Sequence, residues 1–234
     1  MSKRPHAQLH INPSALPAWF SALIDSIRTG NLDELVRFQQ PADIVVRESA
    51  VLILFGEGLT GPDVLIIERA AEMRSHAGQP AFPGGACEAE DASPVVTALR
   101  EAWEETNLDP SGVTVVATLP PLWLPPSGFI VIPVIGWWHE SSPVSVGDPL
   151  EVAAVHRVAI SDLANPANRV RVSHPTGYVG PGFEVSGMLV WGFTGMILDR
   201  LISLAGWELP WESGARVVPF DDGYHLPKDR GAAT

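Results

Sequence analysis

Three glutamates in the middle of the chain have the spacing that a metal site needs. Glu101, Glu104 and Glu105 lie three or four positions apart, so a helix would bring their carboxylates together along one edge. Like charges at this spacing repel each other, and a bound cation reverses the sign of that interaction. Hard carboxylate oxygens on a rigid element suit Mg²⁺ or Mn²⁺, above all when substrate phosphate completes the coordination shell. The alternative is a solvated acidic helix face, because charge clusters on helices are common.

The residues around these glutamates predict a tight loop followed by a helix. Gly84 and Gly85 allow backbone angles that are closed to other residues, and an acidic linker, 86–92, comes next. Ser93 suits the N-cap and Pro94 suits the first helical position. The helix is expected to stop near Asn107, a residue that tolerates the left-handed C-cap conformation.

This order of a glycine loop, an acidic linker and the run R-E-A-W-E-E at 100–105 resembles the Nudix box of the nucleoside-diphosphate-X hydrolases. Two features depart from the family pattern. Asn107 stands where the family usually has Gly, and the count from Gly85 to Arg100 is one residue longer than usual. Counted from Gly85, the first acid of the box is Asp91. Counted from Arg100, the same position falls on Ala92.

A second stretch, 65–85, resembles the signature of the coenzyme A diphosphatase branch of that family. The branch reads roughly L-L-T-x-R-S-A, followed by R-x-x-x-G-x-x-x-F-P-G-G. The matching residues are Arg69, Ala71, Arg74, Gly78, Phe82, Pro83, Gly84 and Gly85. Ile67 and Ala70 replace the usual Thr and Ser, so hydroxyl contacts are absent there. The extra residue in the box also fits this branch. The two motifs cover 65–108, and weaker similarity continues to about residue 204.

The resemblance implies roles for the acidic residues. The implied metal-binding residues are Glu101, Glu104, Glu105 and Gly85, and Arg100 would orient a glutamate through a charge-assisted hydrogen bond. The bound ions would neutralise the diphosphate and lower the pKa of a water. Glu104 or Glu151 would take the proton of that water, which then attacks phosphorus. Glu151 is a candidate because a late acid often completes Nudix sites. It can equally be an acid before a strand with no such role.

The same resemblance implies a set of substrate-binding residues: Arg69, Arg74, Gly78, Phe82 and Gly84. The two arginines are candidates for phosphate contact, because the guanidinium fork matches phosphate oxygens, although loop arginines are often simply solvated. His76 in the same loop is more simply a bystander. Trp123, with Leu124 and Trp191, offers apolar surface for the uncharged arm of coenzyme A, and core packing is the simpler role.

We therefore predict a metal-dependent enzyme that hydrolyses the pyrophosphate bond of coenzyme A or its derivatives, as the resemblance implies. The products would be 3′,5′-ADP and 4′-phosphopantetheine or its acyl form. One alternative is a Nudix hydrolase of another diphosphate, such as NADH or ADP-ribose, and the upstream signature argues against it. The other is a Nudix-like domain that binds nucleotides without hydrolysis, and the three intact box glutamates argue against that.

Composition limits the partners and the compartment. The net charge is −12 and there are only two lysines, so the surface should repel nucleic acid and anionic membranes. We expect a small-molecule substrate that is bound through metal ions and nearby arginines. The sequence does not decide between a monomer and a homodimer. The single cysteine, Cys87, excludes an internal disulfide and fits a reducing, cytoplasmic setting. No apolar run follows the charged N-terminus, and the longest uncharged apolar stretch, 185–198, is too short to span a bilayer.

The order of the predicted elements favours an α/β fold with a mixed sheet between helix layers, which agrees with the Nudix-type α/β/α sandwich that the resemblance implies. We expect a helical N-terminal extension at 1–40, the hydrolase domain at 41–206 and a C-terminal tail at 207–234 that is disordered in part. The apolar patterns predict helices at 17–27, 32–38, 94–106, 161–164 and 188–205, strands at 43–55, 63–68, 113–119, 129–138 and 152–160, and a hairpin of 169–172 with 182–185.

Overall fold

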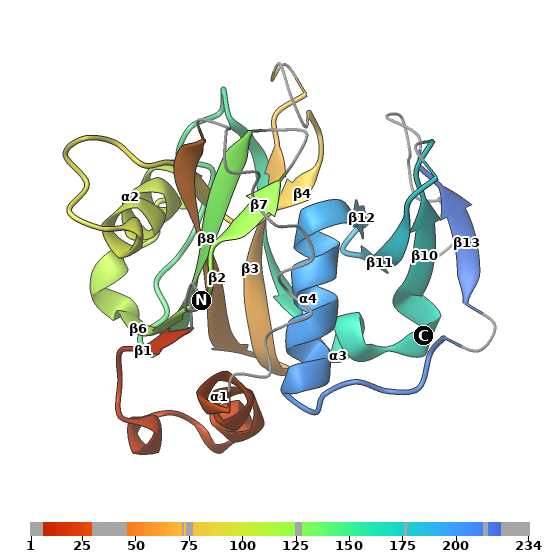
Figure 1. Cartoon of the computed structure of the whole chain (residues 1–234), viewed down its shortest axis with the longest axis horizontal. Coiled ribbons are helices and arrows are strands. Elements are labelled where there is room, and N and C mark those ends of the chain that lie inside the picture. The colour runs from red at the N-terminus through yellow and green to blue at the C-terminus, as the bar shows by residue number, and fades with distance from the viewer. Residues whose placement is uncertain are drawn as a thin grey trace, which may run out of the picture.

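The computed structural model describes residues 7–29, 46–71, 73, 77–124, 128–175, 177–212 and 215–220. The predicted helix at 32–38, Arg74 and His76 lie outside the described residues. Within them, nine strands form one mixed sheet through the middle of the molecule, with the main order β1-β6-β8-β2-β3-β4 (Figure 1). Its strands are β1 (Gln8–Leu9), β2 (Arg47–Gly58), β3 (Gly61–Arg69), β4 (Pro80–Ala81), β5 (Gly84–Ala86), β6 (Val113–Thr118), β7 (Leu122–Leu124), β8 (Phe129–Trp138) and β9 (Val152–Ala159).

Strands β2 and β8 form the centre of the sheet. They run parallel, with Leu52 opposite Val134, and the run 50–55 of β2 and nearly all of β8 are apolar because both faces of the sheet are covered there. Strand β2 extends to Gly58, three residues past the predicted end at 55. The chain reverses after Gly58, where Gly61 pairs with it at a φ of 110°. The other predicted strands of this sheet are confirmed to within one or two residues.

Helices cover both faces of the sheet (Figure 1). Helix α2 (Pro94–Thr106) packs on one face through Ala98 and Ala102, which join a buried cluster with residues of β2 and β8. Helices α1 (Ser21–Arg28) and α4 (Gly192–Leu204) cover the other face. This arrangement confirms the predicted α/β sandwich with a mixed sheet.

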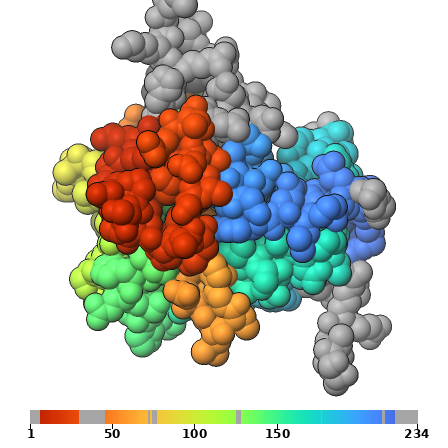
Figure 2. All heavy atoms as spheres, turned by 90° about the horizontal axis from the view of Figure 1, so that it is seen from below, coloured from red at the N-terminus to blue at the C-terminus, as the bar shows by residue number. Residues whose placement is uncertain are grey.

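The N-terminal residues belong to the same core as the C-terminal helix. Phe20 and Leu23 are fully buried in the cluster that contains Leu198 and Leu201 of α4. The hydroxyl of Ser26 donates to the carbonyl of Leu204 at 3.0 Å. Figure 2 shows the N-terminal segment lying directly against the C-terminal part of the chain. The segment at 7–29 is therefore packed onto the core between the large sheet and α4.

A smaller four-stranded sheet lies beyond α4, with the order β12-β11-β10-β13. The predicted hairpin is confirmed as β10 (Arg169–Ser173) against β11 (Val179–Val185). Strand β13 (Arg216–Pro219) runs parallel to β10 and was not predicted. Helix α3 (Ile160–Ala164) leads into this sheet, and the short 3₁₀ helices are η1 (Pro13–Ala15), η2 (Ala18–Phe20), η3 (Pro110–Gly112) and η4 (Pro166–Asn168).

The predicted helix at 188–205 is wrong in its first turn. Ser186 and Gly187 both have positive φ, at 51° and 80°, and form a turn that brings the chain back as β12 (Met188–Val190) beside β11. The helix begins only at Gly192, whose φ is 62°. The run 188–190 therefore pairs as a strand before the helix starts. Among the described residues, no helix has the length and apolar character needed to cross a membrane.

Candidate active site

The two ends of α2 are fixed by the residues that the sequence indicated. The Ser93 hydroxyl accepts a hydrogen bond from the backbone N–H of Val96 at 3.4 Å, and Pro94 occupies the first turn. At the other end, Asn107 has the left-handed conformation, with φ 53° and ψ 24°, and its backbone N–H donates to the carbonyl of Trp103 at 2.9 Å. The predicted caps are both confirmed.

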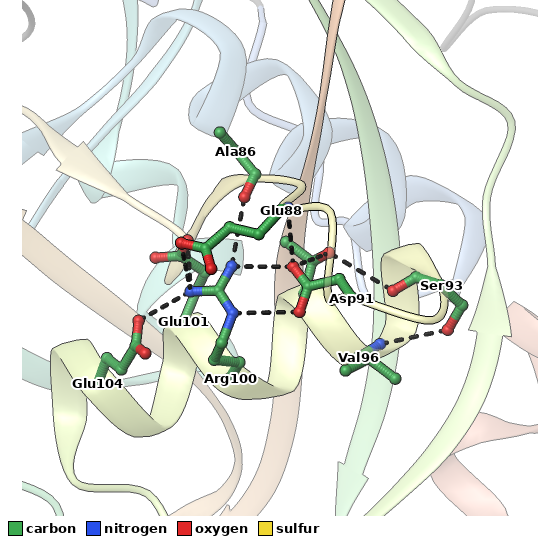
Figure 3. A network of polar contacts seen from close by, with 9 residues as sticks. Ala86, Glu88, Asp91, Ser93, Val96, Arg100, Glu101 and Glu104 are labelled. Atoms are coloured by element: carbon green, nitrogen blue, oxygen red, sulfur yellow. Dashed lines mark hydrogen bonds and ion pairs between the residues drawn. The ribbon is translucent and has the colours of Figure 1, made fainter.

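Arg100 is the centre of a polar network on this helix (Figure 3). Its Nε and Nη2 donate to the two carboxylate oxygens of Asp91 at 3.2 and 3.0 Å. Its Nη1 lies 3.1 Å from Glu101 Oε1 and 2.9 Å from Glu104 Oε2, and Nη2 also donates to the Ala86 carbonyl at 3.3 Å. One guanidinium therefore fixes the linker and two of the box glutamates together.

Asp91 is thus the acid that Arg100 contacts, which decides between the two ways of counting the box. The Arg100 guanidinium holds the pKa of the Asp91 carboxyl well below its usual range. Asp91 Oδ2 also accepts hydrogen bonds from Thr97 Oγ1 at 2.9 Å and from the Glu88 backbone N–H at 3.0 Å. The linker is folded back onto the helix, so the extra residue is absorbed in this loop.

The two glycines of the loop allow the backbone to approach the helix and the sheet. A Cβ on Gly85 would overlap the carboxylate of Glu101, and one on Gly84 would overlap the carbonyl of Ala50 in β2. The Gly84 backbone N–H donates to Glu105 Oε2 at 2.8 Å. Close contact with the backbone of β2 therefore requires glycine at position 84, whereas a side chain at position 85 would displace the Glu101 carboxylate. The Gly84 N–H directly holds the box glutamate Glu105.

Glu105 is almost completely buried, and its two oxygens differ. Oε2 accepts the Gly84 hydrogen bond, whereas Oε1 is buried without a hydrogen-bond partner among the described residues. Burial raises the pKa of Glu105 to about 8, and the negative charges of Glu101 and Glu151 add to that effect, while the Gly84 N–H and Arg69 oppose it. Burial also raises the pKa of Glu101, and Arg100 opposes that shift.

Glu151 reaches the same place from the loop before β9. A pocket of about 510 Å³ brings the acidic residues and Arg100 together. Its lining residues are Glu88, Arg100, Glu101, Trp103, Glu104, Glu105, Asn107, Gly147, Asp148 and Glu151. All five predicted catalytic residues line this pocket.

The predicted substrate-binding residues lie in different places. Arg69 ends β3, and its charge acts on Glu105. Gly78 lies in the loop that follows Arg69, and Gly84 lies in the glycine loop. Phe82 is buried in the core on the α4 side of the sheet and does not line the pocket. Arg74 lies outside the described residues.

The tryptophans considered for the pantetheine arm pack elsewhere. Trp123 is buried in β7, and Trp191 packs against Phe220 beside the small sheet, with tilted rings whose centroids are 4.0 Å apart. The pocket lining instead includes Asp148 and the half-exposed Trp103. Neither residue was predicted to belong to the site. Trp103 could have been found from its position between Glu101 and Glu104, and Asp148 from its position three residues before Glu151.

Comparison with known proteins now identifies the family. The family model described as the NUDIX domain matches residues 46–175. The chain belongs to the Nudix family. Relatives include an uncharacterized Nudix hydrolase NudL of Enterobacter sp. (strain 638), 34% identical over 181 residues that cover 72% of this chain and 88% of the relative. Another, from Cronobacter sakazakii (strain ATCC BAA-894), is 38% identical over 147 residues that cover 60% of this chain and 73% of the relative.

Solved structures of Nudix proteins are also similar. One is the Nudix hydrolase RenU of M. smegmatis, with a TM-score of 0.47 and 18% identity, covering 70% of this chain and 88% of that protein. Another is a MutT/nudix family protein of Enterococcus faecalis, with a TM-score of 0.45 and 14% identity, covering 83% of this chain and 76% of that protein. As a Nudix hydrolase, the chain acts on the pyrophosphate bond of a nucleoside diphosphate derivative.

Nudix hydrolases use divalent metal ions such as Mg²⁺, and the residues of this site fit such an ion. The unpaired, buried Oε1 of Glu105 and the mutual repulsion of Glu101, Glu105 and Glu151 are both relieved by a cation. No three or more Asp, Glu, His or Cys side chains in the described part of the chain are arranged to hold a metal by themselves. The glutamates of the site would supply only part of a coordination shell for Mg²⁺, an ion that usually keeps waters and binds substrate phosphates.

Proposed function

We propose that this Nudix hydrolase cleaves the pyrophosphate of coenzyme A or its derivatives to 3′,5′-ADP and 4′-phosphopantetheine or its acyl form. The observation that carries the proposal is the upstream signature, with Arg69 beside the box glutamate Glu105. The charge of Arg69 acts on Glu105, and its Nε is buried without a hydrogen-bond partner among the described residues. A buried guanidinium N–H next to a metal-binding carboxylate is suited to meet a phosphate oxygen.

The loop that follows Arg69 is closed at its base. The Arg69 backbone N–H donates to the Gln79 carbonyl at 3.2 Å, and the Gly78 N–H donates to the Arg69 carbonyl at 3.0 Å. Gly78 has a φ of 67°, which explains glycine at this position of the signature. The role of Arg74 toward the anionic parts of the substrate is proposed from the signature alone.

Glu101 and Glu105, with Glu104 assisting, would hold the divalent ion, and the Gly85 backbone lies against Glu101. When bound, the ion neutralises diphosphate oxygens and makes a water more acidic. Arg100 orients Glu101 and Glu104 through its fixed pairing with Asp91. Because Glu104 is hydrogen-bonded to Arg100, Glu151 is the more available acceptor for the proton of the attacking water. The box itself acts on any diphosphate, so the choice of coenzyme A falls to the residues of the signature.

A side-by-side kinetic comparison at one Mg²⁺ concentration tests the substrate. We expect kcat/KM for coenzyme A to exceed that for ADP-ribose and NADH by about tenfold or more, which corresponds to about 1.4 kcal/mol of transition-state discrimination. Dephospho-coenzyme A lacks only the 3′-phosphate, so its kcat/KM relative to that of coenzyme A measures how much this phosphate contributes to recognition. Products are identified by mass. Equal or better turnover of ADP-ribose would remove the coenzyme A assignment, and no product from any of the four compounds would support a nucleotide-binding domain instead.

A further inference from the structure

Glu151 reaches the site on a loop whose position is set by the end of α2. The loop runs from the end of β8 to β9 and has no regular hydrogen-bonded ladder over 139–151. Its Ser145 N–H donates to the Thr106 carbonyl at 3.0 Å, and its Gly147 N–H donates to the Glu105 carbonyl at 2.9 Å. These carbonyls belong to the last turn of the helix, where no intrahelical donor is available. The loop therefore caps the helix that carries the box glutamates.

Asn107 adds a side-chain clamp to these backbone contacts. Its Nδ2 donates to Ser145 Oγ at 3.0 Å and to the Val146 carbonyl at 3.3 Å. Its backbone has the left-handed conformation in which glycine is the usual residue at a helix end. A glycine there would form the same backbone cap but would have no amide to hold the loop. The asparagine thus provides a contact that the usual family residue cannot.

The clamp is connected to Glu151 by a short and tightly bonded segment. Gly147 lies so close to the helix that a Cβ there would overlap the Glu104 carbonyl. Asp148 then accepts three backbone hydrogen bonds: Oδ1 from Leu150 at 2.8 Å, and its carbonyl from Glu151 at 3.2 Å and Val152 at 2.9 Å. A shift of the loop at 145–147 would pass to Glu151 within a few residues.

From this geometry we infer that Asn107 is a positioning residue that holds Glu151 against Glu101 and Glu105. The inference rests on the role of Glu151 as proton acceptor in the proposed function. Asn107 does not touch the substrate in this scheme. It acts on the reaction only through the loop that it binds. Loss of its amide should therefore change the rate of the chemical step more than substrate binding.

The test is a double-mutant cycle of Asn107→Gly with Glu151→Gln, measured on the full chain with Mg²⁺ and with both coenzyme A and ADP-ribose. Glycine keeps the left-handed cap and removes only the amide. We expect Asn107→Gly alone to lower kcat by about tenfold, because small displacements of a reacting group are costly, with KM changed less than about twofold. In the Glu151→Gln background, the same change should have no further effect on kcat.

The outcomes separate the inference from the function on which it rests. Equal fold losses from Asn107→Gly in both backgrounds would overturn the positioning role while leaving the role of Glu151 intact. Unchanged kcat in Glu151→Gln alone would remove the role of Glu151 and the inference with it, whereas the substrate preference is read separately from the ratio of the two substrates. Asn168→Gly is the control. It removes a side-chain hydrogen bond, in which Asn168 Nδ2 donates to the Asp162 carbonyl at 2.9 Å, at a position far along the chain from the site. Should Asn107→Gly lower the melting temperature clearly more than this control, Ser145→Ala, which removes the Oγ acceptor of the Asn107 amide and leaves the helix cap unchanged, repeats the cycle.

Discussion

At the scale of single residues, the site is defined by how unequally its carboxylates are surrounded. Asp91 is fully paired by Arg100, and its pKa is lowered. Glu105 is buried with one oxygen unpaired, and its pKa is raised to about 8. Opposite shifts within one small region are common at functional sites. Here they separate an acid that holds the structure from an acid that is suited to bind a cation.

Neutralising either Glu101, which is partly buried, or Glu105, which is buried, should stop turnover without unfolding the protein. We expect Glu101→Gln and Glu105→Gln each to lower kcat by at least about 10²-fold, since the carboxylate charge is lost while the side-chain shape is kept. Circular dichroism should stay near that of the unmodified protein, and the melting temperature should not fall. Glu90→Gln, in the exposed part of the linker, is the matched control and should be neutral. Near-normal turnover in both folded variants would refute the metal-site assignment.

The raised pKa of Glu105 also predicts how stability depends on pH in metal-free protein. The folded-state pKa, about 8, lies above the ordinary value of 4.5, so between these values the folded state binds a proton that the unfolded state does not. Stability from this group is therefore complete below about pH 4.5 and is lost as the pH rises through about 8. In EDTA, the melting temperature should fall as the pH rises from about 4.5 to about 8. Glu105→Gln should make the melting temperature depend less on pH over this range. If the melting temperature of Glu105→Gln depended on pH as steeply as that of the unmodified protein, the raised pKa of Glu105 would be contradicted.

At the scale of elements, the sequence predicts local structure well and long-range pairing poorly. The caps of α2 at Ser93 and Asn107 depend on neighbouring residues only, so they could be read directly. The start of α4 could not, because 188–190 have an apolar pattern that suits either a helix or a buried strand, and pairing with β11 decides. Strand β13 pairs with β10 across more than 40 positions, a contact for which a four-residue strand gives no local signal. The approach of Glu151 to Glu105 depends on the same kind of long-range contact.

Arg169 connects three of these elements, and its removal should weaken the small sheet. Its side chain is fully buried between the rings of Phe183 and Trp211, at 4.5 and 4.1 Å from their centroids, and it pairs with Asp199 of α4. Breaking such a pair leaves a charge poorly compensated. We expect Arg169→Met to lower the free energy of unfolding by about 3 kcal/mol in urea, at the low end of the usual range because Asp199 keeps 32% of its side-chain surface exposed.

The control for this change is an arginine in an exposed pair. Arg28 lies 3.7 Å from Asp25 and both side chains are mostly in solvent, so Arg28→Met should change the free energy of unfolding by less than about 1 kcal/mol. The double variant Arg169→Met with Asp199→Asn should recover part of the loss, since it removes the uncompensated charge. Equal effects of Arg169→Met and Arg28→Met would show that the buried pair contributes no more than a surface pair.

At the scale of the whole molecule, one continuous core joins the N-terminal segment, the large sheet and α4, while the surface carries a net charge of −12. A rigid scaffold of this kind can hold several carboxylates close together against their repulsion. The same negative charge opposes the approach of an anionic diphosphate. We therefore expect substrate binding to depend on added cations, because Arg100 is already paired with Asp91, Glu101 and Glu104, and Arg69 supplies only one further positive charge.

This charge balance predicts an absolute requirement for a divalent cation. EDTA should abolish turnover, and added Mg²⁺ or Mn²⁺ should restore it, because a coordinated ion neutralises the glutamates and the diphosphate together. NaCl at matched ionic strength is the control, since it screens the net charge of the molecule without coordinating the carboxylates. If NaCl restored activity as well as Mg²⁺ does, general repulsion rather than a specific site would limit the enzyme. Full turnover in chelator would rule out the metal mechanism, because it would show that no coordinated ion is needed to neutralise the diphosphate.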